Sequence, residues 1–431
     1  MKVALVNPRW HFDNSIYFGC AAPHLPLELG YAKALLERDG HEVLMLDGNL
    51  VETSNQALAE EVAAFGAEIS IATTAPTYLF WRCAPPELRV PAEFFAHLDK
   101  RGGTTIAIGP HGSVTPETTL RKLGADGVVM GEAEEVIAAI AQASDPTSVR
   151  STAWMTDDGP VTNGGPAASA FIAHPALSWP DEWVKRHAHH HHRFDDAPAV
   201  PGAEVEASRG CPYNCSFCAK IDYRDKYRRR DLEQLLQEID QLIAQGVGYL
   251  YFVDEIFLAQ KPLLEALVER PVQFGVQTRI DIWSEPMIEL LGAAGCVSVE
   301  AGLESLTEEG RANLDKRCKM TTEELADRLV FAKARIPFVQ ANLIATPEDE
   351  PELVAYWRDH LRDQGVWAND PVPLYPYPSS PAYRKMWGPP DSDAWERAHD
   401  YYLAQFQSFS DIQDERPLRL HELEGACRHH S

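Results

Sequence analysis

The chain has 431 residues, of which 45% are hydrophobic and 9% aromatic, and its formal net charge at pH 7 is −25. This length exceeds what one hydrophobic core usually supports, so we expect two domains. The negative charge argues against a nucleic-acid partner, because binding phosphates requires clustered Lys and Arg side chains. The sequence shows neither a signal peptide nor a long apolar run, so we expect no membrane contact and a cytoplasmic location, where clustered cysteines more often bind metals than form disulfides.

Short apolar runs in the first part of the chain are typical of buried strands. They cover residues 3–6, 42–47, 69–73, 105–109 and 127–131, and segments with helical periodicity, such as 27–40, separate them. Five buried strands alternating with helices predict a doubly wound parallel sheet over residues 1–141, with ligands bound beyond the carboxyl ends of the strands. Residues 142–203 lose this pattern, and we expect a linker with little local structure.

Strand and helix patterns alternate again over residues 204–376. Strands are expected at 204–208, 249–254, 272–278, 296–302 and 338–345, with a sixth inside 366–376. Repeated units of this length predict a partial (β/α)6 barrel of the TIM type, in which chemistry takes place at the carboxyl ends of the strands. Residues 377–431 form a C-terminal extension near the substrate site. The Tyr- and Pro-rich stretch 373–387 lines the substrate entrance or forms a rigid covering loop.

Three cysteines follow the first strand of the predicted barrel. Cys211, Cys215 and Cys218 have the spacing C-x3-C-x2-C. Cysteine thiolates hold iron–sulfur cubanes, normally four of them, and a compact loop can supply several ligands. Three ligands leave one iron open, and an open coordination position marks a site that binds a substrate. The alternative is a zinc site or an electron carrier completed by a distant cysteine.

Two further stretches have an unusual composition. The basic run YRDKYRRRD at 223–231 is interpreted as a solvated loop and helix start, with a contact to an anionic group of the substrate or cofactor as the alternative. The run HAHHHH at 187–192 lies in the predicted linker without acidic or cysteine neighbours at ligand spacing. We interpret it as an exposed segment that binds metals only adventitiously.

The cysteine loop, with Phe217 directly before its third cysteine, resembles the signature of the radical SAM superfamily. The stretches 251–257, 278–283, 297–316, 340–352 and 374–383 resemble motifs of the cobalamin-binding subgroup, and 23–48 and 108–137 resemble the B12 domain of that subgroup. The resemblance implies a Rossmann-like cobalamin-binding domain followed by a barrel with a [4Fe-4S] cluster. The open iron of the cluster would bind S-adenosylmethionine (SAM).

The activity implied by this resemblance is radical C-methylation of a small molecule such as a sugar or a natural-product scaffold. A 5′-deoxyadenosyl radical would activate the substrate carbon, methylcobalamin would supply the methyl group, and a flavodoxin or ferredoxin would supply electrons. A cobalamin-dependent cyclase or ring-rearranging enzyme would share every motif. A cobalamin and iron–sulfur sensor without turnover would need an output domain, and a tRNA methylthiolating enzyme would need a second cluster domain and a basic RNA-binding domain.

Residues at the barrel's strand ends are the candidates for SAM contacts. Asp254 is placed to accept a hydrogen bond from the SAM ammonium group, and Glu300 to accept from both ribose hydroxyls. Arg279 would hold the SAM carboxylate or form a structural ion pair. The full set is Phe217, Asp254, Arg279, Glu300, Gly302, Gln340 and Asn342. The last two alternate on one strand and are either ligand contacts or buried structural amides.

The cobalamin contacts are expected in the loops that follow the strands of the first sheet. They comprise Asn7, Pro8, Thr73, Thr74, Gly109, Pro110, His111, Gly112, Gly131 and Glu132. Small or hydroxyl-bearing residues let the backbone approach the corrin and hydrogen-bond its amide side arms.

Histidine ligands to cobalt are not expected. Cobalamin mutases supply one from a D-x-H-x-x-G segment, and the loop after the first strand lacks this motif. His11 and His24 lie in that loop in the wrong context, and His41 follows an Asp-Gly pair that only mimics the start of the motif. We therefore expect cobalamin to be bound without a protein histidine.

Overall fold

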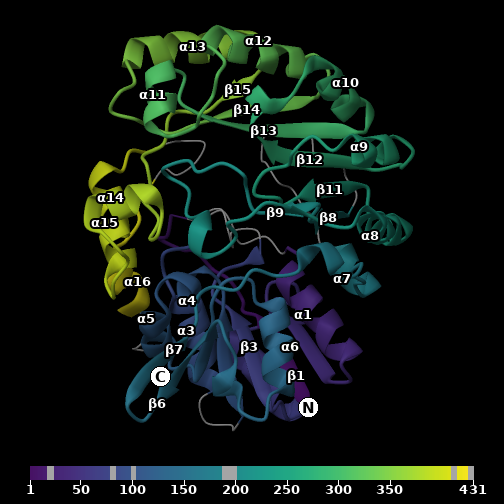
Figure 1. Cartoon of the computed structure of the whole chain (residues 1–431), viewed down its shortest axis with the longest axis vertical. Coiled ribbons are helices and arrows are strands. Elements are labelled where there is room, and N and C mark those ends of the chain that lie inside the picture. Colours follow the sequence, from purple (N-terminus) through teal and green to yellow (C-terminus); the bar gives the residue numbers. More distant parts are fainter. Residues whose placement is uncertain (17–23, 78–83, 99–102, 187–200, 409–414, 426–431) are drawn as a thin grey trace.

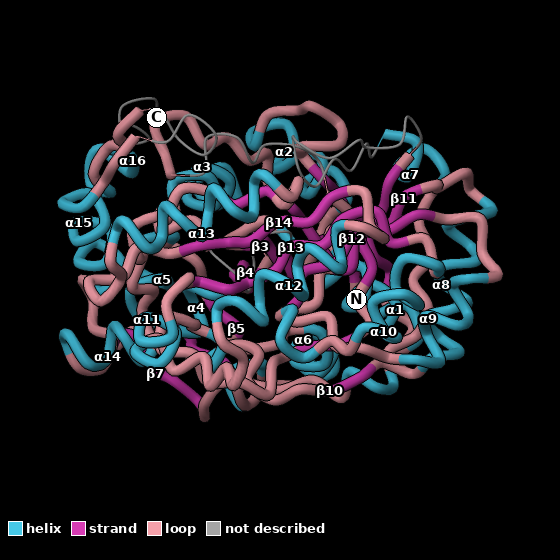
Figure 2. The backbone as a smooth tube through the Cα atoms, turned by 90° about the horizontal axis from the view of Figure 1, so that it is seen from above, coloured by secondary structure: helices cyan, strands magenta, loops and turns pink. Residues whose placement is uncertain are grey.

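The computed structural model describes residues 1–16, 24–77, 84–98, 103–186, 201–408 and 415–425. The histidine run at 187–192 lies outside these residues. The described chain forms two units, one built on each of two sheets, and the C-terminal helices lie along one side of both units (Figure 1). Viewed from above, most strands of the two sheets lie toward the middle and helices gather at both ends, whereas β7 lies at the lower edge among loops (Figure 2).

The first unit is a parallel sheet covered by helices on both faces. Its parallel strands are β1 (Lys2–Asn7), β2 (Glu42–Asp47), β3 (Ile69–Thr73), β4 (Thr104–Ile108) and β5 (Gly127–Val129), in the order β2-β1-β3-β4-β5. Helices α1 (Leu27–Arg38) and α6 (Glu134–Gln142) pack on one face, and α2 (Asn55–Phe65), α3 (Arg89–Leu98) and α5 (Pro116–Leu123) pack on the other. The predicted doubly wound sheet is confirmed.

Alternation along each strand explains why short apolar runs form this sheet. In β1, Val3 and Leu5 belong to the core beneath α1 and α6, whereas Ala4 and Val6 belong to the core on the opposite face. A parallel strand that is buried on both faces must be apolar at every position. The polar residue Asn7 comes only where β1 ends, at the edge where ligands of such sheets bind.

The first sheet continues into the segment that the sequence assigns to a linker. Strands β6 (Thr152–Thr156) and β7 (Gly159–Asn163) form an antiparallel hairpin on the edge of β5, so the described sheet has seven strands. The ring of Trp154 packs on Gly127, where a Cβ atom would come within 2.8 Å of that ring. The outer half of the hairpin is exposed, which removes the apolar pattern that would have revealed it. The expected linker is thus partly wrong, and the sheet extends beyond residue 141.

The second unit is an open parallel sheet of six strands in the described residues. They are β8 (Gly202–Val205), β11 (Tyr249–Phe252), β12 (Gln273–Thr278), β13 (Cys296–Glu304), β14 (Phe338–Leu343) and β15 (Trp367–Ala368), in the order β15-β14-β13-β12-β11-β8. Helices α8 (Leu232–Ala244), α9 (Lys261–Val268), α10 (Glu285–Ala293), α12 (Thr322–Lys333) and α13 (Pro351–Asp363) follow these strands in turn. The predicted partial (β/α)6 barrel is confirmed, with its last strand inside 366–376.

The two faces of the barrel sheet differ in polarity. Val276, Val299 and Val339 are buried in the core that the helices cover. On the opposite face, Gln277, Glu300 and Gln340 lie in register on β12, β13 and β14. A polar row inside a barrel cannot pack as an ordinary core, so this face is suited to holding polar ligands.

The C-terminal extension packs against the first unit. It contains α14 (Pro381–Trp387), α15 (Ala394–Gln405) and α16 (Leu420–Gly425). The Trp395 indole N–H donates to Thr115 Oγ1 at 3.2 Å, and the ammonium of Lys122 pairs with Glu396 and Glu424. The extension therefore joins the end of the barrel to the first sheet. No helix in the described ranges combines the length and apolar character that crossing a bilayer requires.

Candidate functional site

The three cysteines lie on a loop that begins directly after β9 (Ser208–Arg209), which pairs with β10 (Arg228–Arg229). Gly210 adopts a φ of +75°, and a Cβ atom there would stand 2.2 Å from the Lys226 carbonyl oxygen. Its N–H donates to Glu255 Oε2 at 2.6 Å. Gly210 is thus required both by its backbone angle and by the close approach of the neighbouring chain.

The cysteine loop is also held from outside. The Ser216 N–H donates to the Leu314 carbonyl at 3.0 Å, and the Ser216 carbonyl accepts from the Ala382 N–H at 2.7 Å. The loop is therefore fixed between the barrel and α14. Such a scaffold holds ligands in place before a cofactor arrives.

The three thiols fit a cluster better than a single ion. Cys211 and Cys215 are close enough to each other and to Cys218 for their charges to interact, and burial raises the pKa of Cys218 to about 12. In the described residues, no group of three His, Cys, Asp or Glu side chains surrounds a point that could hold one metal ion. A cubane takes one thiolate at each of several irons, so its ligands surround a larger body.

Cationic side chains stand beside the cysteine loop. The Arg279 guanidinium lies 4.0 Å from the ring centre of Tyr213 and forms two hydrogen bonds with Asp281, at 3.0 and 2.7 Å. Lys316 Nζ lies 5.8 Å from the ring centre of Phe217. The predicted residue Arg279 is thus brought to the loop that carries Phe217. Arg279 is already paired with Asp281, as in the structural alternative.

The polar row on the barrel strands contains two of the predicted SAM residues, Glu300 and Gln340, and the next register pair, Gly302 and Asn342, contains two more. Glu300 lies between Gln277 and Gln340 in register, and Gln277 Nε2 is 3.4 Å from Glu300 Oε2. The Gln340 amide donates to Asn342 Oδ1. The Gly302 carbonyl, at the next inward position of β13, accepts from Lys316 Nζ at 2.8 Å. The row offers carboxylate and amide oxygens, which suit hydroxyl and ammonium donors.

The carboxylate pair after β11 serves the loop itself. Asp254 is fully buried, accepts from the Ala207 N–H at 2.9 Å and from the Ser208 hydroxyl, and burial raises its pKa. Glu255 accepts from the Gly210 N–H. Both carboxylates hold the backbone that leads into Cys211. Each Asp254 oxygen accepts from one of these donors, Oδ1 from Ala207 and Oδ2 from Ser208. The predicted contact with the SAM ammonium would therefore have to share one of these oxygens.

The carboxyl edge of the first sheet gathers the small polar residues expected to bind cobalamin. Asn7 Oδ1 accepts from the Thr73 hydroxyl at 3.1 Å and from the Trp10 indole N–H at 2.7 Å. Pro8 is buried directly after Asn7. The edge thus carries amide and hydroxyl groups side by side, a set that suits hydrogen bonds to the amide side arms of a corrin.

The loop after β4 packs under the C-terminal extension. Gly109 has a φ of 133° and precedes the short helix α4 (Pro110–Val114). The buried His111 ring packs against Trp395 with ring centres 4.4 Å apart and planes tilted by 32°, and its Nδ1 is 3.2 Å from the Thr74 hydroxyl. Burial lowers the pKa of His111 to about 3, so the ring is neutral. A Cβ on Gly112 would lie 3.2 Å from Val128, so this glycine serves helix packing.

Two predicted cobalamin residues have evident structural partners. Gly131 has a φ of +81°, and a Cβ there would be 2.3 Å from the Ala167 carbonyl oxygen. Glu132 is buried, accepts from the Ser169 N–H at 2.7 Å, and pairs with Arg228. Arginine partners lower the pKa of Glu132 to about 2 although burial opposes this. Glu132 therefore faces the barrel unit as a fixed anion.

The histidines considered as cobalt ligands occupy three different environments. His24 is buried with its Nδ1 2.6 Å from Glu204 Oε1, a carboxylate on the first barrel strand. The His11 carbonyl accepts from Arg89 Nη2 at 3.3 Å. His41 lies just before β2, at the opposite end of that strand from Asp47. His24 thus links the first unit to the barrel.

The basic run after the cysteine loop is partly buried, so the solvated-loop interpretation is wrong for its buried arginines, whereas Lys226 and Arg229 are exposed and a helix starts after Asp231 as expected. Arg224 and Arg230 have side chains that are 1% and 0% exposed, and Arg228 is 21% exposed. Arg230 pairs with Glu238 at 2.6 Å, whereas Arg224 and Arg228 reach carboxylates of the first unit. The first-unit partners of Arg224 and Arg228 are far away in the sequence, so composition alone could not reveal them.

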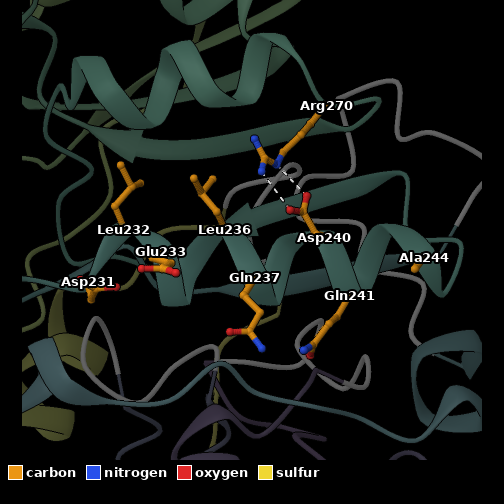
Figure 3. A pocket seen from close by; sticks show the side chains of 9 residues that line it. All are labelled: Asp231, Leu232, Glu233, Leu236, Gln237, Asp240, Gln241, Ala244 and Arg270. Atoms are coloured by element: carbon orange, nitrogen blue, oxygen red, sulfur yellow. Dashed lines mark hydrogen bonds and ion pairs between the residues drawn. The ribbon is translucent and has the colours of Figure 1, made fainter.

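A surface groove lies away from the predicted site residues. It has a volume of about 950 Å³, runs along the outer face of α8, and includes Arg270 and Asp240, which form two hydrogen bonds (Figure 3). None of the predicted site residues lines it. The candidate site is therefore the cysteine loop and the polar edges that face it.

A three-cysteine loop after the first strand of a partial barrel is the arrangement expected for the radical SAM class. Residues 205–355 match the Radical SAM superfamily, and this part of the chain is a radical SAM domain. The chain is 26% identical over 322 residues to an uncharacterized methyltransferase of Pyrococcus horikoshii, an alignment that covers 71% of this chain and 66% of that protein. It is 25% identical to the anaerobic magnesium-protoporphyrin IX monomethyl ester cyclase of Rubrivivax gelatinosus, over 90% of this chain and 70% of that one.

Solved structures share the whole two-unit fold. The methyltransferase TsrM of Kitasatospora setae, solved with cobalamin and a [4Fe-4S] cluster, has a TM-score of 0.72, with 18% identity over 88% of this chain and 76% of that one. The cobalamin-dependent radical enzyme OxsB has a TM-score of 0.71, with 16% identity over 91% of this chain and 63% of that one. The order of a doubly wound sheet followed by a partial barrel is therefore a known arrangement.

Proposed function

We propose that the protein is a cobalamin-dependent radical SAM methyltransferase that acts on an unactivated carbon of a small molecule. The observation that carries this proposal is the direct connection between the two polar edges. The segment 206–228, which includes the cysteine loop, forms ion pairs with residues at the carboxyl-edge side of the first sheet. Transfer of a methyl group between two cofactors requires them to share one enclosed space, because proximity supplies much of the rate.

The residues of the two edges divide the binding tasks. Cys211, Cys215 and Cys218 would hold the cluster, and the row around Glu300 would hold SAM. Asn7, Thr73 and Thr74 would contact the corrin. When bound, these cofactors supply the radical and the methyl group; the protein supplies their placement.

The chain also shields the site from water. Trp395 of α15 covers His111, and Tyr375 packs on Tyr377 and Tyr402 at ring-centre distances of 4.5 and 5.6 Å. These rings come from the end of the barrel and from the C-terminal extension. Aromatic packing of this kind would help to keep solvent away from a radical. The stretch 373–387 therefore acts mainly as a covering segment in this proposal.

A second candidate is a cyclase or rearrangement without methyl transfer. It is favoured by the Rubrivivax gelatinosus relative, whose name is that of a cyclase and which aligns with 90% of this chain. The fold and the cysteine loop would be the same for both activities. The two differ in the fate of SAM.

The deciding experiment uses protein reconstituted with iron, sulfide and hydroxocobalamin without oxygen. A reductant such as reduced flavodoxin, SAM and a panel of small-molecule substrates are added, and 5′-deoxyadenosine and S-adenosylhomocysteine are both quantified. A substrate that raises both products supports methylation. A substrate that raises 5′-deoxyadenosine alone supports the cyclase. Failure of the protein to bind cobalamin would refute both.

Two cysteine variants provide a matched control. Cys218→Ser removes a thiolate of the loop, and we expect it to lose iron and form no 5′-deoxyadenosine. Cys296→Ser changes a buried cysteine on β13 whose Sγ donates to the Ser298 carbonyl at 3.4 Å. A serine hydroxyl can make the same hydrogen bond, so iron content should stay at the level of the parent protein. Equal iron loss in both variants would contradict the assignment.

A further inference from the structure

Two buried arginines flank the cysteine loop. Arg209 directly precedes Gly210, and Arg224 follows Cys218 after the short helical turn Lys220–Asp222. The side chains of Arg209 and Arg224 are 0% and 1% exposed. A guanidinium removed from water is costly unless carboxylates surround it. Their partners therefore show which parts of the protein these arginines hold together.

Arg224 contacts both units. Its Nη1 lies 2.5 Å from Glu206 Oε1 and 3.2 Å from Glu255 Oε1, both in the barrel unit. Its Nη2 lies 3.7 Å from Glu28 Oε1, on the first turn of α1. Glu255 also accepts from the Gly210 N–H. The Arg224 side chain therefore links the start of the cysteine loop to the first unit.

Arg209 makes a second link of the same kind. Its Nη1 lies 2.6 Å from Glu134 Oε1, at the start of α6 in the first unit, and its Nη2 lies 2.8 Å from Glu206 Oε2. Its guanidinium also lies 4.5 Å from the ring centre of Phe171 and 5.2 Å from that of Tyr31. Glu206 thus holds Arg209 and Arg224 together.

The charges in this group nearly balance. Its guanidinium groups belong to Arg209, Arg224 and Arg228, and its carboxylates to Glu132, Glu134, Glu206 and Glu255. Glu28 is a further member; burial raises its pKa to about 8, and it accepts from the Thr77 hydroxyl at 2.7 Å. Buried ion pairs of this kind add little net stability, and in some proteins they instead specify one geometry.

We infer that Arg209 and Arg224 are positioning residues that fix the cysteine loop relative to the carboxyl edge of the first sheet. They set the separation between the cluster and the corrin. This inference rests on the proposed binding of both cofactors. A misplacement of about 1 Å between reacting groups can lower a rate by about 10²-fold.

The test compares two arginine-to-lysine variants. Arg224→Lys keeps a positive charge but loses the forked guanidinium that reaches Glu206, Glu255 and Glu28 together. Arg230→Lys is the matched control. Arg230 is equally buried, but it pairs with Glu238 of α8 and donates to the Pro175 carbonyl. Its contact with the first unit is the ring of Tyr31, 5.2 Å away, and no ion pair described for it joins the loop to that unit.

The first readout is the electron paramagnetic resonance spectrum of the reduced cluster beside cob(II)alamin. We expect Arg224→Lys to change the magnetic coupling between the two centres and to lower methylated product per 5′-deoxyadenosine at least tenfold. Arg230→Lys should lower thermal stability and leave both quantities unchanged. If both variants change them equally, or if Arg224→Lys changes neither, the inference is wrong.

The second readout needs no cofactor. In hydrogen exchange of the apoprotein, Arg224→Lys should speed exchange both in residues 208–218 and in α1, whereas Arg230→Lys should speed it in α8. If Arg224→Lys does not fold, Glu134→Gln weakens the link of Arg209 from the first unit and should speed exchange in 208–218. If hydrogen exchange becomes faster only around the substituted residue in each variant, the inference is wrong. Absence of cobalamin binding by the parent protein would instead refute the proposed function.

Discussion

The substitution Glu28→Gln tests the buried charge group through its response to pH. The groups that face Glu28 are the Thr77 hydroxyl at 2.7 Å, the Arg224 guanidinium at 3.7 Å, and the carboxylate of Glu206. Burial is the strongest influence and raises the pKa of Glu28 from 4.5 to about 8 despite the nearby arginine. At neutral pH the folded chain therefore keeps a proton on Glu28 that the unfolded chain has lost.

This difference makes the parent protein less stable as the pH rises. The folded state binds more protons than the unfolded state between pH 4.5 and 8, so raising the pH in this window favours unfolding. From about pH 6 to about pH 8 the loss is about 2 kcal/mol of unfolding free energy. The amide introduced by Glu28→Gln cannot ionise and is expected to remove this part of the pH dependence. It also keeps an oxygen for the Thr77 hydroxyl.

Thermal unfolding of both proteins at about pH 6, 7 and 8 measures the effect. The difference in Tm between the variant and the parent should grow by about 2–5 °C in favour of the variant over this range, the lower value if the whole chain unfolds together. Taking the difference cancels other groups that titrate nearby, such as Glu87, whose pKa burial raises to about 7. Parallel curves for the two proteins would show that Glu28 is ionised throughout, and the reasoning would be refuted.

Two other substitutions test the packing around the first sheet. Gly131→Ala puts a methyl group against the Ala167 carbonyl and is expected to cost several kcal/mol of unfolding free energy. Gly124 has a similar φ of +63°, but a methyl group there meets no atom within 4 Å, so Gly124→Ala should cost about 1 kcal/mol. Equal losses of Tm in the two variants would contradict this account. Trp395→Ala removes the ring that stacks on His111 and should cost about 3–5 kcal/mol. Limited proteolysis should then cut the C-terminal extension first, and an unchanged cleavage pattern would show that this ring does not hold it.

Local patterns in the sequence were enough to predict the two sheets. A parallel strand covered on both faces is apolar at most positions, so runs such as 3–6 and 69–73 could be recognised without tertiary information. The hairpin of β6 and β7 was missed for the opposite reason, because only its inner end is buried. Neither strand alternates apolar and polar residues, which is the pattern that would mark a half-buried strand.

The sequence by itself determined the ligand loop, because the cysteine spacing is a local property and Gly210 adjoins it. Only the tertiary structure decided the roles of the charged residues around it. Arg209 and Arg224 find Glu134 and Glu28 across the two units, at positions far away in the chain. Whether a charged side chain is solvated or buried depends on such distant partners. Burial requires a partner of opposite charge, and folding alone brings that partner into place.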